Sequence, residues 1–165
     1  MPGDDLVPGC QVTWTRAIMI DAPPDLVWPW LVQVGFGKAG FYSNDCLTTR
    51  GHPSAEHTAP QLQRLHIGDW DPMFKKVDET TAFRVHSFEA PQQLVWSKAD
   101  STWAWPLMPV PPSRTRLVTR IRQRYDWHSP GSALLTAVLM EFADFPMMRR
   151  MLKGIKARAE SANAP

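Results

Sequence analysis

The sequence predicts an α+β fold in which a long C-terminal helix lies across one face of a curved antiparallel sheet. Three observations predict this fold. One early stretch alternates bulky and polar residues, short segments rich in Val, Phe, Thr and Trp follow after Gly68, and an apolar pattern of helical period runs from Ser129 to about Glu160. Strands followed by one long helix are typical of α+β domains, and such a sheet and helix can enclose a cavity.

The first elements are a strand and a helix. Residues Gln11 to Asp21 alternate with a period near two, which predicts the strand. Pro23 and Pro24 end it, and Pro24 suits the first turn of a helix, where its missing N–H costs least. Apolar residues then recur at helical spacing until Gly35. We expect a second short helix around Tyr42 to Leu47, followed by a polar loop.

The middle of the chain predicts an antiparallel meander. Short β-type segments alternate with turn residues such as Asp78-Glu79, Asp100-Ser101 and Pro109 to Ser113. The predicted strands are Asp69 to Lys76, Thr81 to Glu89, Leu94 to Ala99, Thr102 to Met108 and Arg114 to Trp127.

The last segment predicts the long helix. Ser129 can cap it and Pro130 can be its first residue. Pro146 interrupts the pattern and predicts a kink. The apolar residues before and after Pro146 fall on different faces, so the two halves are expected to meet different surroundings. These residues are Leu135, Val138, Leu139, Phe142 and Phe145 before it, and Met148, Met151, Leu152 and Ile155 after it.

Length and composition limit the kind of protein. The 165 residues fit one domain, expected as residues 1–165 with an ordered core from about 10 to 160. A formal net charge of +2 is too small to favour nucleic acid binding. No stretch approaches the ~18 apolar residues of a membrane span. The spacing of Cys10 and Cys46 matches no metal site, so we expect a cytoplasmic protein without metal or other cofactor.

Two chemical motifs are better explained by structure than by chemistry at a site, and a third is absent. The GxGxxG run from Gly35 to Gly40 follows a predicted helix rather than a strand, so a tight turn is favoured over a dinucleotide site. His52, Glu56, His57 and His66 lack the spacing of metal ligands, which favours a solvated loop. No GxSxG is present, so hydrolase chemistry is not supported.

Strand alternation predicts an aromatic wall. Trp103 and Trp105 share one face of their strand, and so do Leu94 and Trp96 in theirs. If these faces point inward, they suit a large flat or greasy ligand as well as they suit an ordinary core. The presence of Thr119 among the inward residues favours a cavity, because a plain core avoids unpaired polar groups. The other inward candidates are Phe83, Val85, Leu117, Ile121 and Gln123.

Basic residues gather on two surfaces. Arg116, Arg120, Arg122 and Arg124 lie on the opposite side of the last strand, where they can either clamp an anion or form a solvated face. The cluster on the last helix allows an anionic membrane surface or a solvated flank, and the flank is favoured because no apolar boundary accompanies it. Its members are Arg149, Arg150, Lys153, Lys156 and Arg158.

The sequence resembles the SRPBCC superfamily, the START-like helix-grip group that includes polyketide cyclases and the birch pollen allergen type. The resemblance rests on Ile20 to Gly35, Gly40 to Ser43, Leu65 to Asp69, Arg114 to Arg122 and Met151 to Glu160. It implies a seven-stranded antiparallel sheet wrapped around a long C-terminal helix, with two short helices near the N-terminus. It also implies an apolar cavity for a lipid-like or polycyclic ligand, and no universal catalytic residue.

The leading hypothesis is therefore a cofactor-free protein that binds, or binds and transports, a hydrophobic small molecule such as a lipid, isoprenoid or polyketide. Residues Phe36 to His66 are the expected gate. One alternative is a cyclase, aromatase or dehydratase in which Tyr42 and Asp45 act as acid and base. Another is a START-like protein-interaction module, and the oligomeric state stays open. Expected ligand contacts are Trp30, Tyr42, Phe83, Val85, Trp96, Trp103, Trp105, Leu117, Thr119, Ile121, Gln123, Phe142 and Phe145.

Overall fold

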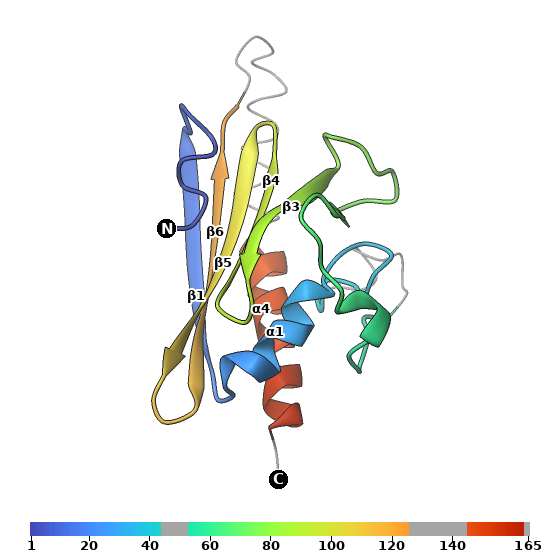
Figure 1. Ribbon diagram of the computed structural model, residues 1–165, viewed down its shortest axis with the longest axis vertical. Helices are drawn as coiled ribbons and strands as arrows, with labels where there is room; N and C mark the ends of the chain where they lie inside the picture. Colours follow the sequence, from blue (N-terminus) through green and yellow to red (C-terminus); the bar gives the residue numbers. More distant parts are fainter. Residues whose placement is uncertain (44–52, 126–144, 164–165) are drawn as a thin grey trace.

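Within the described residues, six strands form one antiparallel sheet in the order β1-β6-β5-β4-β3-β2 (Figure 1). The computed structural model describes residues 1–43, 53–125 and 145–163. The strands are β1 (Val12–Ile20), β2 (Trp70–Pro72), β3 (Ala82–Glu89), β4 (Gln93–Lys98), β5 (Ser101–Val110) and β6 (Arg114–Gln123). The helical elements are α1 (Pro24–Val32), the 3₁₀ turn η1 (Pro60–Leu62) and α4 (Phe145–Ala162).

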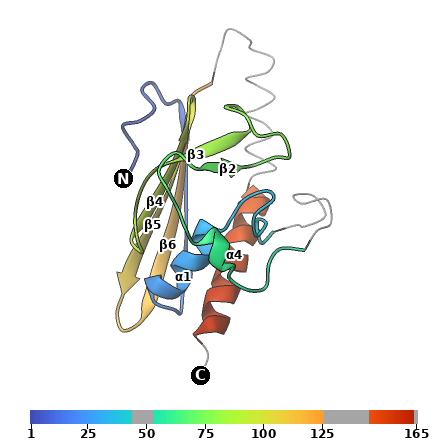
Figure 2. The ribbon, with the colours of Figure 1, turned by 45° about the vertical axis from the view of Figure 1, so that its right-hand side comes forward.

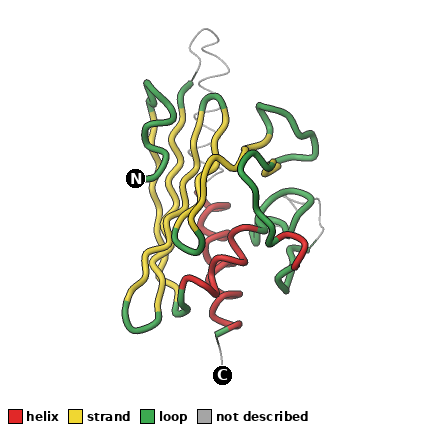
Figure 3. The backbone as a smooth tube through the Cα atoms, viewed as in Figure 1, coloured by secondary structure: helices red, strands yellow, loops and turns green. Residues whose placement is uncertain are grey.

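Helices α1 and α4 lie on the same face of the sheet (Figures 1 and 2). α4 packs against α1 and β1, and α1 also contacts β5 and β6. α1 starts where predicted, because Pro23 is extended and Pro24 occupies the first turn. The result is a layer of strands and a layer of helices (Figure 3).

The main core lies between these layers. Leu94, Leu117 and Ile155 have no exposed surface, and they come from β4, β6 and α4. Inward residues alternate with outward ones along each strand, so the buried side chains of the strands meet the helices on a single face. The apolar residues that follow Pro146 form the buried face of α4, as their spacing predicted: Met148, Met151, Leu152 and Ile155.

The N-terminal segment, residues 1–11, crosses the other face of the sheet (Figure 2). A Cβ added to Gly3 would lie 2.8 Å from Cγ1 of Val95, which points outward between Leu94 and Trp96. Val7 is buried as well. The outer face of the sheet is therefore partly an apolar interface.

The predicted strands are found, with some differences in length. β2 stops at Pro72 rather than near Lys76, because residues 73–81 turn back toward β3. The sheet has six strands in the described residues, rather than the seven implied by the resemblance. The expected second helix at Tyr42 to Leu47 is not seen at its start, because Tyr42 has a left-handed φ of 51°. Residues 44–47, and the expected helical stretch 129–144 before Pro146, lie outside the described residues.

Candidate functional site

Three tryptophans from neighbouring strands form one aromatic cluster beneath the helices. The ring centroids of Trp103 and Trp105 lie 5.0 Å apart, and those of Trp96 and Trp103 lie 5.3 Å apart. Phe83 of β3 joins them at 5.7 Å from Trp103. The register explains this arrangement, since Trp96 of β4 is paired with Trp103 of β5 and directly opposed side chains share a face. The aromatic wall predicted from strand alternation is thus present.

Among the described residues, one of the three indole N–H groups of this cluster has a hydrogen-bond acceptor and two have none. Trp103 Nε1 donates to Thr119 Oγ1 at 2.7 Å, which satisfies the polar group predicted among the inward residues. Nε1 of Trp96 and Nε1 of Trp105 are buried and have no acceptor among the described residues. Buried donors without acceptors are rare in folded proteins, because each loses its bond to water without replacement.

The remaining predicted contacts divide into three groups. Val85, Leu117 and Trp30 are buried in the same core, whereas Ile121 is only half-buried beside it. Gln123 donates its side-chain N–H to Arg124 O at 2.9 Å, so its amide already has a partner. Asp45 and Phe142 lie outside the described residues, and so does the side chain of Phe145.

Tyr42 is held by a structural network. Its hydroxyl donates to Trp30 O at 3.2 Å and accepts from Gln33 Nε2 at 2.8 Å. Burial raises the pKa of Tyr42 to about 12, against the opposing effects of the Gln33 hydrogen bond and the Arg158 charge. Arg158 lies over the ring, with Cζ 4.5 Å from its centroid. The hydroxyl is therefore protonated at neutral pH, with both its donor and acceptor positions in use.

The GxGxxG run forms the tight turn expected for it. Gly35 and Gly40 pair as an isolated antiparallel bridge, and their φ angles of 137° and 84° are ones that favour glycine. The element before this turn is α1, which excludes the strand–turn–helix arrangement of a dinucleotide site.

A buried ion pair, which no sequence pattern predicted, joins this turn to β2. Lys38 Nζ lies 2.9 Å from Asp71 Oδ1, and Asp71 has no exposed surface. Burial raises the pKa of Asp71 to about 6, although Lys38 lowers it in opposition. The second oxygen, Oδ2, has no hydrogen-bond partner among the described residues. The only hint in the sequence is one carboxylate between Trp70 and Pro72 in a predicted strand.

A groove lies between β1 and α4. It has a volume of about 360 Å³ and is lined by Ala17, Ile18 and Leu152, with Arg16, Arg149 and Lys153 beside them. Two other basic residues of α4 have partners elsewhere. Lys156 pairs with Glu160 at 2.7 Å, and Arg158 Nε donates to Ala55 O at 2.8 Å. The basic cluster of the helix is thus not one uniform solvated flank.

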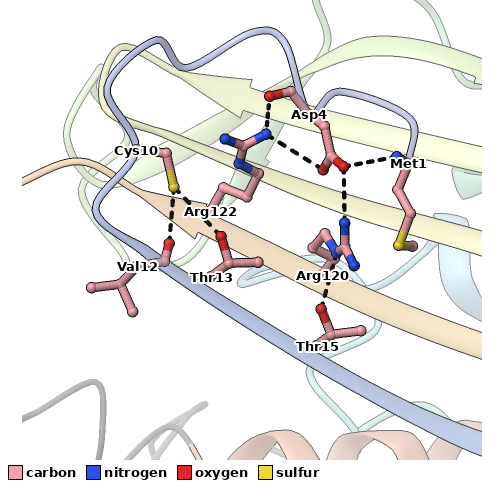
Figure 4. Close-up of polar contacts among 8 residues, drawn as sticks. All are labelled: Met1, Asp4, Cys10, Val12, Thr13, Thr15, Arg120 and Arg122. Carbon is pink, nitrogen blue, oxygen red and sulfur yellow. Dashed lines mark hydrogen bonds and ion pairs between the residues drawn. The ribbon is translucent and has the colours of Figure 1, made fainter.

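Two of the outward arginines, Arg120 and Arg122 of β6, hold the N-terminal segment rather than an external anion (Figure 4). Arg116 is exposed, as expected for a solvated face. Arg120 Nη1 lies 2.8 Å from Asp4 Oδ2, and its Nε donates to Thr15 Oγ1 at 2.9 Å. Arg122 donates to the backbone oxygen of Asp4. Arg124 Nη1 donates to Pro8 O at 3.4 Å. The segment thereby supplies the acceptors that an external anion would otherwise offer.

Replacing Asp4 by alanine is expected to loosen this segment without disturbing the core. The change leaves two arginines short of a carboxylate partner, and charge-assisted hydrogen bonds of this kind contribute about 1–2 kcal/mol. Limited proteolysis should then cut within residues 1–11 faster, and the midpoint of thermal unfolding should fall by about 2–4 °C for each kcal/mol lost. Replacing Asp5, which is exposed, is the matched control. Equal cleavage rates in the two variants would contradict this role of Asp4.

No family model matches this sequence, and no curated protein matches it. Several solved structures, in contrast, have a fold similar to that of this chain. A protein from Rhodobacter sphaeroides aligns with a TM-score of 0.54 and 17% identity over 93% of this chain and 96% of that chain. The Zhui aromatase/cyclase from a Streptomyces species aligns at 0.52 and 15% identity, with the same coverage of 93% and 96%. A conserved protein of unknown function from Enterococcus faecalis aligns at 0.53 and 14%, over 96% of this chain and 77% of that chain.

The chain has a helix-grip fold. The six-stranded antiparallel sheet, the short N-terminal helix and the C-terminal helix all agree with these structures. At such identities the likeness extends to the fold alone. Among the described residues, no cluster of three His, Cys, Asp or Glu side chains could hold a metal ion. None of the described helices is long and apolar enough to cross a membrane.

Proposed function

We propose that this helix-grip protein binds a hydrophobic small molecule that carries an acceptor oxygen, between the sheet and the helices. A flat polycyclic ketone or polyketide fits this description, in keeping with the resemblance to the SRPBCC superfamily. The ligand would contact Trp96, Trp103, Trp105 and Phe83.

One observation carries the proposal. Two buried indole N–H groups, on Trp96 and Trp105, lack acceptors and belong to rings whose centroids lie 5.9 Å apart. Ligand sites in proteins are mostly apolar, with a few polar groups that fix the orientation of the ligand. An oxygen brought in by a ligand would satisfy donors that the described residues leave without a partner. Aromatic faces around it would bury the remainder of the ligand.

Binding is favoured over catalysis by the state of the acid–base candidates. Tyr42, the catalytic candidate that the structure describes, has its hydroxyl engaged with Trp30 and Gln33. Because its pKa is raised to about 12, the hydroxyl is protonated at neutral pH and is not ready to accept a proton as a base. A cyclase activity would therefore need a group other than Tyr42.

Replacing Trp96 or Trp105 by phenylalanine tests the proposal with two matched probes. Fluorenone and fluorene share a flat tricyclic frame and differ in one carbonyl. The wild-type protein is expected to prefer fluorenone, and each variant should reduce this preference by about 3- to 10-fold, the value of one hydrogen bond. Tryptophan fluorescence or calorimetry can measure both affinities. Thermal unfolding of each variant checks that it folds.

Trp103→Phe is the matched control, because the Trp103 N–H already has Thr119 as its acceptor. This variant loses a similar ring volume but should keep the preference for fluorenone. If neither probe binds the wild-type protein, and native mass spectrometry with solvent extraction finds no retained hydrophobic molecule, the proposed function is wrong.

A further inference from the structure

The groove between β1 and α4 combines an apolar floor with positive charge. Ile18 is half-buried and Leu152 is 4% exposed, and the two come from the sheet and the helix respectively. Ile18 points to the inner face of β1, because it shares the alternation of the buried Ile20. The groove therefore lies beside the space between the sheet and the helix.

α4 contributes two exposed cations to this groove. Arg149 and Lys153 are four residues apart, so they project from the same side of the helix. Both are exposed, and neither forms an ion pair within residues 1–43, 53–125 and 145–163. No acidic side chain is among the described residues that line the groove. Two such cations beside apolar side chains match the chemistry of an anionic amphiphile.

We propose that the groove binds the anionic end of an amphiphilic ligand, a carboxylate in the first instance, on Arg149 and Lys153. The apolar part of the same ligand would then lie against Ile18 and Leu152 and extend between the sheet and the helix. This inference rests on the proposed function for the apolar part of the ligand, and it adds a charged end to the class of ligand.

Pyrenebutyrate and pyrenebutanol test the charge separately from the apolar part. The two fluorescent probes differ only in a carboxylate and a hydroxyl. We expect the wild-type protein to bind pyrenebutyrate at least about 5-fold more tightly, with an affinity that falls as salt rises. The double variant R149Q/K153Q should lose most of this preference and bind pyrenebutanol unchanged.

The double variant K75Q/R114Q is the matched control, since it removes the same charge at exposed positions outside the groove. It should keep the wild-type preference. If pyrenebutanol binds and pyrenebutyrate binds no more tightly, the charged site is wrong and the proposed function stands. If neither probe binds, both fail. A concentration-dependent dimer that R149Q/K153Q disrupts would assign the groove to a second copy of the chain and overturn the inference.

Discussion

Replacing Lys38 by methionine is expected to lower the free energy of unfolding by about 3 kcal/mol at pH 7.5. The Asp71 carboxylate has no exposed surface in the native protein, where Lys38 Nζ lies 2.9 Å from its Oδ1. The change removes this cation and leaves the buried carboxylate unpaired. Removing one partner of a buried pair costs more than the pair itself contributes, because the remaining charge keeps its desolvation penalty. Chemical denaturation of the two proteins measures the difference.

The stability lost on replacing Lys38 by methionine should increase as the pH rises from 4 to 7.5. The pKa of Asp71 in the folded protein is about 6, above the ordinary value of an aspartate, about 3.9, so this group favours folding most below about pH 4. Its contribution is lost as the pH rises toward 6, by at most about 1.4 kcal/mol per pH unit. Without Lys38 the pKa of Asp71 rises further, so the K38M variant should be nearly as stable as wild type at pH 4 and much less stable at pH 7.5.

Two variants separate this explanation from a general loss of packing. K38M/D71N removes the buried charge and should lose the extra pH dependence. K76M removes an exposed partner of Asp78 and should leave stability unchanged, because Lys76 is 83% exposed. A K38M variant equally destabilised at both pH values would show that the Lys38 side chain matters for its packing rather than for the charge of Asp71.

Replacing Gly154 by alanine is expected to destabilise the protein by about 2–3 kcal/mol, although alanine favours helices over glycine. A Cβ at this position of α4 would lie 2.5 Å from Cβ of Tyr42 and would also meet the Tyr42 backbone oxygen. Tyr42 cannot easily move, since its hydroxyl is bonded to Trp30 and Gln33 and its N–H donates to Ser54 Oγ at 3.1 Å. Thermal and denaturant unfolding measure the effect.

The exposed Ser161 of the same helix provides the control. S161A likewise places an alanine in α4, but at an exposed position and without adding an atom, and it should leave stability the same or slightly higher. A G154A variant as stable as wild type would mean that α4 can shift away from Tyr42 at little cost.

Local patterns predicted most of the fold. Alternation placed Trp103 and Trp105 on one face, and the two prolines before Leu26 placed the start of α1, because each depends on residues close in sequence.

The functional features that were missed depend on distant residues. Lys38 and Asp71 are 33 positions apart, and Asp4 and Arg120 are 116 apart, so no local period reveals either pair. The groove likewise needs β1 and α4 side by side. Tyr42 was expected on a helix with Asp45, but its left-handed backbone contradicts a helical start.

The strand order also bears on how the chain folds. β2 to β6 pair in sequence order, so each pairing needs only a turn or a loop between neighbouring segments. β1 instead pairs with β6, and the partner of Val12 is Gln123, so most of the chain lies between the two paired residues. Closing so large a loop costs conformational entropy before any contact offsets it, and such non-local pairings slow folding. We therefore expect the meander of β2 to β6 to form first and β1, with the N-terminal segment, to join it late.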